Sequence, residues 1–282
     1  MIKVISDSTC DLSKELIEMY DIHIHPLHII LDDQEYRDGV DITPEEIYKW
    51  SDEHKTTPKT SAPSLDAAIT LFSKYLNEYD DIICFSISSE MSTTNNVFHL
   101  AANELDAEDR IHIIDSANLS TGVGHLVIEA AIMAKKGKDA AYIVEAIEEL
   151  KPRVRASFVV DTLTYLHRGG RCGSVAAMAG SVLKLHPKIV VENGKMDAAK
   201  KYRGKMEQVI LTYVKDMETD LKSAKKDRVF ITHSGCDHKI VASVREYLES
   251  LNVFDKIYET KAGGVVSSHC GPGTFGVLYI TT

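Results

Sequence analysis

The chain has 282 residues, of which 44% are hydrophobic, and it carries a formal net charge of −10 at pH 7. A chain of this length and composition can bury a core large enough for two domains of ordinary size. The acidic balance, without a run of lysine and arginine interleaved with aromatics, argues against nucleic acid or an anionic membrane surface as a partner of the whole molecule.

Strand and helix patterns alternate through the first half of the chain. Short apolar runs predict strands and helical spacing predicts helices. We expect strands over 2–5, 22–31, 82–87 and 111–114, and helices over 12–20, from 44, and over 64–79, 92–105, 121–136 and 139–150. Thr43, Pro44 and Glu46 form a capping box that marks one helix start. The repeated βα order indicates a mainly parallel sheet with helices on both faces.

The second half has a different pattern. Strands are expected over 156–160, 189–191, 228–232, 253–259 and 276–280, helices over 175–185, 205–224 and 239–251, and an irregular glycine-rich element over 166–173. Asn193-Gly194 is the preferred pair of a type I′ hairpin. We therefore expect an α/β fold of two α/β domains, residues 1–155 and 156–282, with a ligand pocket between them.

The five cysteines indicate a reducing compartment. They are odd in number, widely spaced and without a C-x-x-C pair, which does not fit the disulfide framework of small secreted proteins. No stretch approaches the roughly 20 apolar residues of a membrane span. We expect a cytoplasmic protein with no stable membrane insertion.

Four hydroxyl-rich loops are the most informative feature of the sequence. They cover residues 6–9, 60–64, 88–94 and 115–121. Ligands of open α/β sheets bind beyond the carboxyl ends of the strands, where helix N-termini offer unpaired N–H groups. These loops contain scarcely a basic residue and the chain has no G-x-x-x-x-G-K-[ST] loop, so they favour a carboxylate over a phosphate. The alternative is that the hydroxyls serve only as helix caps.

Two glycine-containing motifs lead to the same kind of site. Residues 271–276 have the letters of G-x-G-x-x-G, but they lead into the last strand and open no helix, so we interpret them as a tight loop that holds His269. A histidine can complete a carboxylate site whose other groups are hydroxyls. Gly169-Gly170 fixes Arg171 in a constrained loop that suits an anion or a partner's carboxylate. The alternative is a helix C-cap followed by a solvated arginine.

Two further motifs suggest chemistry that the rest of the sequence does not complete. His23, His25 and His28 invite a zinc hypothesis, but no cysteine or carboxylate of suitable spacing joins them. Ser234 follows His233 and could suggest a serine hydrolase, yet the chain has no G-x-S-x-G elbow. We therefore expect neither a metal site nor a catalytic serine.

The motifs taken together resemble those of the DegV family, in the family's order and approximate spacing and over essentially the entire chain. The matching segments are Ser6-Asp7-Ser8-Thr9-Cys10-Asp11-Leu12, Lys59-Thr60-Ser61-Ala62-Pro63-Ser64, Ser88-Ser89-Glu90-Met91-Ser92-Thr93, Asp115-Ser116 with Gly122 and Gly124, Gly169-Gly170-Arg171, Lys201-Tyr202-Arg203-Gly204-Lys205, and His269 before Gly271-Pro272-Gly273. The resemblance implies a two-domain α/β protein that binds a long-chain fatty acid in a tunnel between its domains. It also implies the role of the fatty-acid-binding subunit of bacterial fatty acid kinase, which presents the carboxylate to a separate ATP-binding subunit.

The resemblance further implies which residues bind the fatty acid. They are Thr60 or Ser61, Ser92 or Thr93, His269, and Arg171 near the head-group opening. Two positions depart from the family pattern: Ala62 stands where the family has glutamine, and Thr93 stands where it has glycine. Because threonine makes the second loop stiffer than glycine would, the second carboxylate ligand stays open between Ser92 and Thr93.

A non-catalytic role also follows from the resemblance. No cofactor is expected other than the bound fatty acid, and Arg203, in the basic segment 200–205, matches a region that contacts the kinase subunit. The alternative function is a stand-alone α/β enzyme that acts on a small phosphorylated or carboxylated metabolite. The sequence lacks a phosphate-binding lysine loop, metal ligands and a nucleophile elbow, which argues against that alternative.

Overall fold

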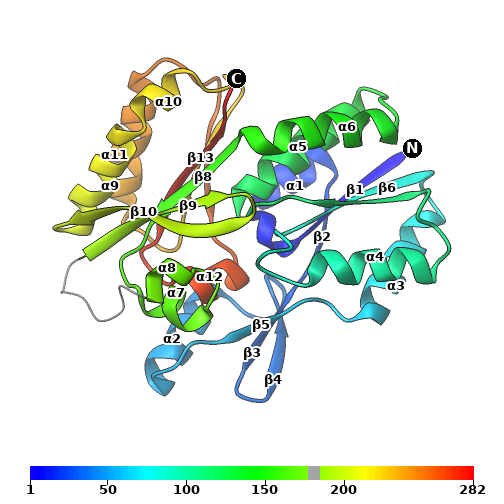
Figure 1. Cartoon of the computed structure of the whole chain (residues 1–282), viewed down its shortest axis with the longest axis horizontal. Coiled ribbons are helices and arrows are strands. Elements are labelled where there is room, and N and C mark those ends of the chain that lie inside the picture. Colours follow the sequence, from blue (N-terminus) through cyan, green and yellow to red (C-terminus); the bar gives the residue numbers. More distant parts are fainter. Residues whose placement is uncertain (177–184) are drawn as a thin grey trace.

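The computed structural model describes residues 1–176 and 185–282, and it confirms the α/β class (Figure 1). The elements of the first half are β1 (Ile2–Asp7), η1 (Ser8–Cys10), α1 (Lys14–Tyr20), β2 (His23–His25), β3 (His28–Leu31), β4 (Gln34–Arg37), α2 (Pro44–His54), β5 (Lys59–Ser61), α3 (Leu65–Leu76), β6 (Asp81–Ser86), α4 (Thr94–Glu104), β7 (Ile111–Asp115), α5 (Thr121–Lys135), α6 (Ala140–Leu150) and η2 (Lys151–Arg153). Those of the second half are β8 (Val154–Val159), α7 (Thr164–Gly169), α8 (Gly173–Ala176), β9 (Leu185–Glu192), β10 (Lys195–Arg203), α9 (Met206–Asp216), α10 (Glu218–Lys222), β11 (Val229–His233), α11 (His238–Ser250), β12 (Ile257–Lys261), α12 (Gly264–Cys270) and β13 (Phe275–Ile280).

The first sheet is parallel, as predicted. Its strand order is β2-β1-β6-β7, and every neighbouring pair is parallel. Residues 82–85 of β6 are fully buried, because a parallel strand covered by helices on both faces needs apolar side chains on both. The predicted capping box is also present: the Thr43 hydroxyl accepts from the Glu46 N–H, and the Glu46 carboxylate accepts from the Thr43 N–H.

The predicted extended stretch 22–31 is two strands that belong to different sheets. β2 joins the parallel sheet, whereas β3 pairs antiparallel with β4 and β5 in a separate three-stranded sheet. Pro26, which has no N–H for a strand ladder, lies between them. The residues around Thr60 therefore form an edge strand rather than the loop we predicted.

The second sheet is mixed, with strand order β10-β9-β8-β13-β11-β12. Only β11 and β12 are parallel neighbours; the other pairs are antiparallel. The type I′ hairpin between β9 and β10 is confirmed, since Asn193 and Gly194 have φ of 50° and 79°. Helices α9, α10 and α11 pack on one face of this sheet (Figure 1).

Four predictions in the second half need correction or lie outside the described residues. The expected helix 205–224 is two helices, because its helical ladder is interrupted at Met217. The expected strand 253–259 begins only at Ile257. The glycine-rich element contains the short helix α7. The expected helix 175–185 falls mainly on residues 177–184, outside the described residues, and Leu185 already opens β9.

The two halves meet along α5. The Thr121 hydroxyl lies 2.7 Å from that of Thr232, and His125 Nε2 lies 3.1 Å from the carbonyl oxygen of Leu278. One hydrophobic core includes residues of both halves. We retain the division into residues 1–155 and 156–282 as a proposal, because β8 is the first strand of the second sheet. Within the described ranges, no helix combines the length and the apolar character needed to cross a membrane.

An ion cluster closes the outer end of this interface. Glu129 of α5 pairs with Lys225 and Arg228, and the side chains of Glu129 and Arg228 are 14% and 6% exposed. Glu129→Ala leaves a buried guanidinium without its partner and should lower the free energy of unfolding by about 3–5 kcal/mol in urea denaturation. Glu18→Ala, which breaks an exposed helical pair with Lys14, is the control and should lower it by about 1 kcal/mol or less. Equal effects of the two substitutions would contradict a buried ion cluster.

Candidate functional site

A cavity of about 470 Å³ lies between the two halves. This volume falls within the range of roughly 300–1,000 Å³ that is typical of small-molecule sites. Its apolar lining residues are Leu27, Ile87, Met91, Leu119, Met196, Val265, Val266 and Cys270, together with Ala62. Its polar lining residues are Thr60, Ser61, Ser89, Glu90, Ser92, Thr93, Arg171 and His269.

The structure brings all six sequence-predicted fatty-acid-binding residues to this cavity. They lie on four segments that are far apart in the sequence: β5, the loop before α4, the loop after α7, and α12. Arg203 does not line the cavity; it is exposed at the end of β10. Whether these residues bind a ligand is taken up below as a proposal.

Thr60 and His269 form the central polar pair of the cavity. Thr60 Oγ1 lies 2.8 Å from His269 Nε2. Successive side chains of a strand point to opposite faces, so Ser61 is directed elsewhere, and its hydroxyl lies 3.5 Å from Glu35 Oε1. Of the two candidates left open by the sequence, Thr60 is therefore the one that faces the histidine.

His269 is held as a neutral imidazole. Burial and, to a smaller extent, the charge of Arg171 lower its pKa to about 4. Its Nδ1 is buried and has no hydrogen-bond partner among the described residues. A Cβ at Gly169 would come within 2.5 Å of this nitrogen, so the glycine leaves the space that the ring occupies. The ring nitrogens of a neutral histidine comprise one donor and one acceptor, and Nε2 is the nitrogen that faces Thr60.

The loop before α4 contributes hydroxyls beside this pair. The Ser92 hydroxyl accepts a hydrogen bond from the Thr94 N–H at 3.3 Å and lies 2.9 Å from Thr94 Oγ1. Thr93 makes no capping hydrogen bond with its side chain and is exposed. Both hydroxyls can therefore take a further partner, and the choice between them stays open.

Arg171 extends across the mouth of the cavity. Its Nη1 donates to the Gly169 carbonyl at 2.7 Å and its Nε donates to the Met91 carbonyl at 3.4 Å, so it connects the two halves. Gly170 has φ of 68°, a left-handed conformation that favours glycine, and it forms the C-cap of α7. The turn at Gly170 therefore both caps α7 and places the Arg171 guanidinium over the site.

Only two of the four hydroxyl-rich loops present hydroxyls to the cavity. In the loop 115–121, Asp115 accepts hydrogen bonds from Ser89, and the Ser116 hydroxyl donates to the Asn118 carbonyl; its one residue in the cavity wall is Leu119. Ser6 and Thr9 are fully buried behind the cavity. The loops share the hydroxyl-rich composition, but two of them serve the internal hydrogen bonding of the fold.

The histidines of β2 and β3 have separate partners. His23 Nδ1 lies 2.9 Å from the Tyr75 hydroxyl, His25 packs edge-on against the Phe98 ring, and His28 pairs with Glu35. Across residues 1–176 and 185–282, no group of three or more His, Cys, Asp or Glu side chains could hold a metal ion.

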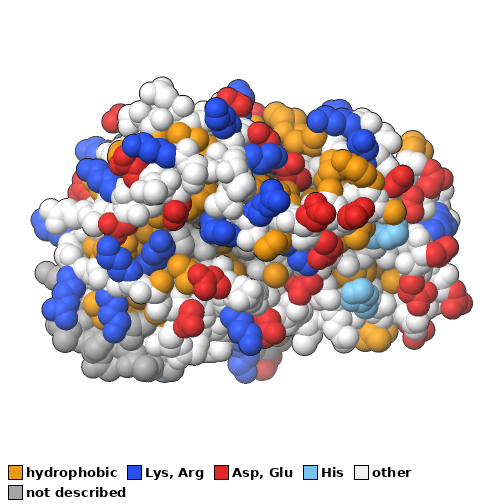
Figure 2. All heavy atoms as spheres, turned by 45° about the horizontal axis from the view of Figure 1, so that its top comes forward, with side chains coloured by type: hydrophobic (Ala, Val, Ile, Leu, Met, Phe, Trp, Pro, Cys, Tyr) orange, Lys and Arg blue, Asp and Glu red, His pale blue; other side chains and the backbone are white. Residues whose placement is uncertain are grey.

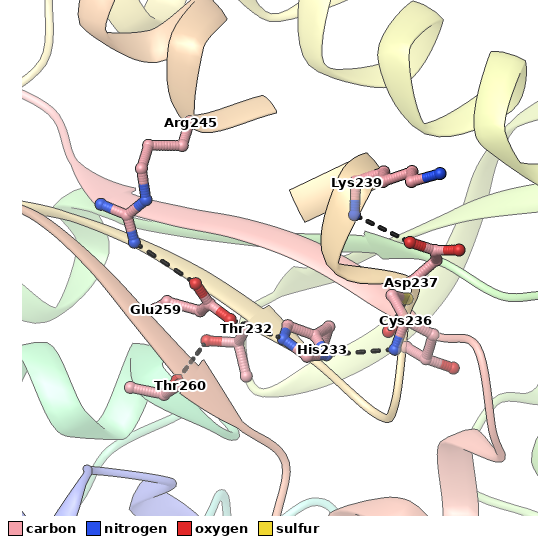
Figure 3. A network of polar contacts seen from close by, with 9 residues as sticks. Thr232, His233, Cys236, Asp237, Lys239, Arg245, Glu259 and Thr260 are labelled. Carbon is pink, nitrogen blue, oxygen red and sulfur yellow. Dashed lines mark hydrogen bonds and ion pairs between the residues drawn. The ribbon is translucent and has the colours of Figure 1, made fainter. Parts of the chain in front are cut away.

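The second-sheet motif of His233 and Ser234 is not a nucleophile and base. His233 Nδ1 accepts from the Cys236 N–H at 3.2 Å, and its Nε2 faces Glu259 Oε1 at 3.3 Å (Figure 3). The Ser234 hydroxyl donates to the Gly271 carbonyl at 2.6 Å. Both ring nitrogens are therefore engaged away from the serine, whereas a hydrolase needs the two side chains hydrogen-bonded to each other. This network anchors the loop between β11 and α11.

The fold and the cavity define a two-domain α/β protein with a ligand-sized space between its halves, and the comparisons agree with this class. The DegV family model matches residues 1–282, and the chain belongs to the DegV family. A DegV domain-containing protein of Caldanaerobacter subterraneus is 31% identical over 280 residues, which cover 99% of this chain and 98% of that protein. Protein DegV of Bacillus subtilis is 28% identical over 279 residues, which cover 99% and 98%.

Solved structures of the family are similar over the whole chain. A fatty-acid-binding DegV family protein from Thermus thermophilus has a TM-score of 0.91 at 30% identity and covers 100% of this chain and 99% of its own. A stearic-acid-binding protein from Eubacterium ventriosum has a TM-score of 0.87 at 30% identity, with coverages of 100% and 98%. DegV of Bacillus subtilis, a fatty-acid-binding protein, has a TM-score of 0.85 at 27% identity, with coverages of 100% and 99%.

The sequence reasoning missed the apolar wall formed by α12. Val265, Val266 and Cys270 line the cavity beside His269, and no helix is predicted from the sequence for the segment before His269. A signal was present, because positions 265, 266, 269 and 270 have the i, i+1, i+4, i+5 spacing of one helix face. Because the helix has only 7 residues, this spacing is too brief to indicate a helix by itself.

The environment of His269 predicts its titration. In ligand-free protein its midpoint, measured by NMR of the imidazole nitrogens, should lie near pH 4, well below the usual value of about 6.5. The sign follows from burial, which disfavours the charged form. A short unstructured peptide with one histidine, whose imidazole has the usual value of about 6.5, is the reference. A His269 midpoint equal to that of the reference would contradict the buried neutral imidazole.

Proposed function

We propose that this protein binds a long-chain fatty acid in the cavity between its halves. The observation that carries the proposal is a cavity in which an apolar wall, formed largely by α12 and the loops after β2 and β6, meets the Thr60–His269 pair and Arg171. An amphiphile with a small anionic head matches such a lining. Fatty acid binding by the structural relatives from Thermus thermophilus and Eubacterium ventriosum supports the same ligand class.

The head group is a carboxylate in this proposal. Its two oxygens would accept hydrogen bonds from the Thr60 hydroxyl, from Nε2–H of His269 and from Ser92 or Thr93, with Arg171 near the opening. Hydrogen bonds to a charged acceptor are worth about 1.5–3 kcal/mol each. Ser61 also lines the cavity, but its hydroxyl faces Glu35. Ser61 would therefore support the site without binding the carboxylate itself.

The acyl chain would lie along the apolar wall. A second, smaller space adjoins the cavity and shares Leu119, Val266 and Cys270 with it, and its further lining includes Phe158 and Leu278 at the second sheet. The end of the chain would point toward this space. Each buried methylene contributes about 0.8 kcal/mol, so the chain dominates the affinity and the head group sets the orientation.

We further propose that the protein is a non-catalytic carrier, located in the cytoplasm, that presents the carboxylate to a separate ATP-dependent kinase subunit for acyl phosphate formation. Its five free cysteines fit a reducing compartment. Figure 2 shows lysine and arginine side chains gathered over the end of the molecule where Figure 1 places β10 and α9. Lys200 there pairs with Asp216, whereas Arg203 is exposed. Arg203 is thus suited to an acidic surface of a partner.

Purified protein should contain a co-purifying fatty acid. Mass spectrometry of lipid extracted from denatured protein would detect it, and palmitic or oleic acid added to delipidated protein should bind with an affinity that changes little between low and high salt, because a buried head group is screened little. A lipid-free preparation that also fails to bind either acid would contradict the proposal.

Ser92→Ala should weaken fatty acid binding by about 1–3 kcal/mol, the effect of removing one hydrogen-bond partner of a charged group. Isothermal titration with palmitic acid measures the change, and Ser243→Ala, at an exposed position on α11, is the control. If Ser92→Ala binds like wild type while Thr93→Ala shows the loss, the second ligand is Thr93. No loss in either variant would remove this loop from the site.

Arg203→Ala should leave fatty acid affinity unchanged and reduce acyl phosphate formation at least about tenfold at low subunit concentration, since an interface arginine can contribute ~2 kcal/mol or more. Coupled turnover with the kinase subunit measures this, and Arg153→Ala, at another exposed arginine, should have no effect. Weakened fatty acid binding with unchanged coupled turnover would place Arg203 in the ligand site instead.

A further inference from the structure

Three aspartates are buried behind the ligand cavity and do not line it. Asp7 ends β1, Asp11 follows η1, and Asp38 follows β4; they are 0%, 5% and 4% exposed. We call them the carboxylate cluster. Their partners are N–H and O–H groups, and burial raises the pKa of Asp7 to about 6 and that of Asp11 to about 8. Burying a carboxyl group is unfavourable unless it is hydrogen-bonded. The hydrogen bonds that the three aspartates accept therefore indicate their structural role.

Asp38 connects two walls of the cavity. One carboxylate oxygen accepts from the Gly264 N–H at 2.7 Å, at the start of α12. The other accepts from the Ser8 hydroxyl at 2.8 Å, and that hydroxyl accepts in turn from the Leu27 N–H at 3.1 Å. Leu27 and α12 both line the cavity, so this one side chain fixes the spacing between them.

Asp11 and Asp7 make corresponding contacts with the neighbouring walls. Asp11 accepts from the Gly263 N–H at 2.8 Å and from the hydroxyl of Ser120, the residue after cavity-lining Leu119. Asp7 accepts from the N–H of cavity-lining Ile87 at 2.7 Å. Side chains of residues 7–11 therefore hydrogen-bond at or beside three cavity-lining residues of the first half, Leu27, Ile87 and Leu119.

The glycines at the start of α12 permit this close approach. A Cβ at Gly264 would come within 2.8 Å of Asp38 Oδ1 and 2.6 Å of Ile29 Cδ1. Both distances are shorter than a Cβ contact allows, so a side chain here would require α12, Asp38 or Ile29 to shift. Gly263 and Gly264 thus pack closely against the aspartates, and these contacts form a joint between the two halves.

We propose that Asp38 and Asp11 are positioning residues of the ligand site: by accepting hydrogen bonds from Gly264 and Gly263, they anchor α12 so that it presents His269, Val265 and Val266 to the cavity. This inference rests on the proposed function for its binding consequence, but the anchoring of α12 is a property of the ligand-free protein as well. His269 touches the ligand in the proposal, whereas the aspartates act through the helix that carries it.

The test compares Asp38→Ala, Asp38→Asn and Asp41→Ala with wild type. Alanine removes the acceptor; asparagine keeps an oxygen for the Gly264 N–H; Asp41 is a solvent-exposed aspartate of the same turn, paired with Arg37. Palmitic acid should bind about tenfold or more weakly to Asp38→Ala, the factor that corresponds to a lost hydrogen bond to a charged group. Asp38→Asn should recover most of the affinity, and Asp41→Ala should bind like wild type.

Hydrogen exchange of the ligand-free proteins provides the second readout. Amides of residues 263–270 should exchange at least about tenfold faster in Asp38→Ala than in wild type, with β8 and β13 unchanged, because only the local opening of α12 becomes easier. A merely global loss of stability would accelerate exchange in the strands too. Unchanged exchange in 263–270, or acceleration that is equal in the strands, would overturn the proposal.

The two readouts separate this inference from the proposed function. If wild type binds no fatty acid but the α12 amides respond locally to Asp38→Ala, the proposed ligand is wrong and the anchoring is right. If wild type binds fatty acid and Asp38→Ala binds equally well, the positioning role is wrong. Should Asp38→Ala fail to fold, Ser8→Ala takes its place, since it removes the hydroxyl donor to Asp38; the same local increase in exchange is expected, and its absence contradicts the proposal.

Discussion

The ligand site depends on how α12 is held against the first half of the chain. In sequence α12 belongs to the second half, but it packs against α2, β3, β5 and η1 of the first. The N–H groups at the start of a helix have no partner within it, and burying them requires acceptors from elsewhere. Asp11 and Asp38 supply these acceptors. The position of His269, one and a half turns further along, follows from that joint.

The electrostatics of the cavity suit a ligand that brings its own charge. In the ligand-free protein the His269 imidazole is neutral, because burial lowers its pKa, and the Thr60 hydroxyl and His269 Nε2 partner each other. The Thr60–His269 pair therefore holds no positive charge in the ligand-free protein. An entering carboxylate would favour the protonated imidazole, with the exposed Arg171 nearby. Head-group binding and proton uptake by the histidine would then be coupled.

Much of the fold could be predicted from local signals. Capping residues fixed helix starts at Thr43, Ser64 and Asp139, and the βα alternation indicated the parallel sheet. The three-stranded sheet was not predicted, because its edge strands β4 and β5 are short and the β3–β5 pairing joins strands that α2 separates in the chain. Helix α12 was missed because seven residues rich in glycine, valine and serine carry little helix propensity; tertiary contacts stabilise it instead.

The candidate site shows the same division. Hydroxyl-rich composition pointed to the loops of Thr60 and Ser92, and the glycine-containing motifs, together with the family resemblance, pointed to His269 and Arg171. The pairing of Thr60 with His269 joins positions 209 residues apart, and no local pattern encodes such a contact. The choice of Thr60 over Ser61 needed the alternation of β5, and the function of Asp11 and Asp38 needed the placement of α12.

A crystal structure of the protein with a bound long-chain fatty acid tests the central claim most directly. The account predicts a carboxylate within about 3 Å of both Thr60 Oγ1 and His269 Nε2, with the acyl chain along Val265 and Val266 toward the second sheet. An acyl chain outside the cavity between the halves, or a carboxylate at the opposite end from His269, would contradict it.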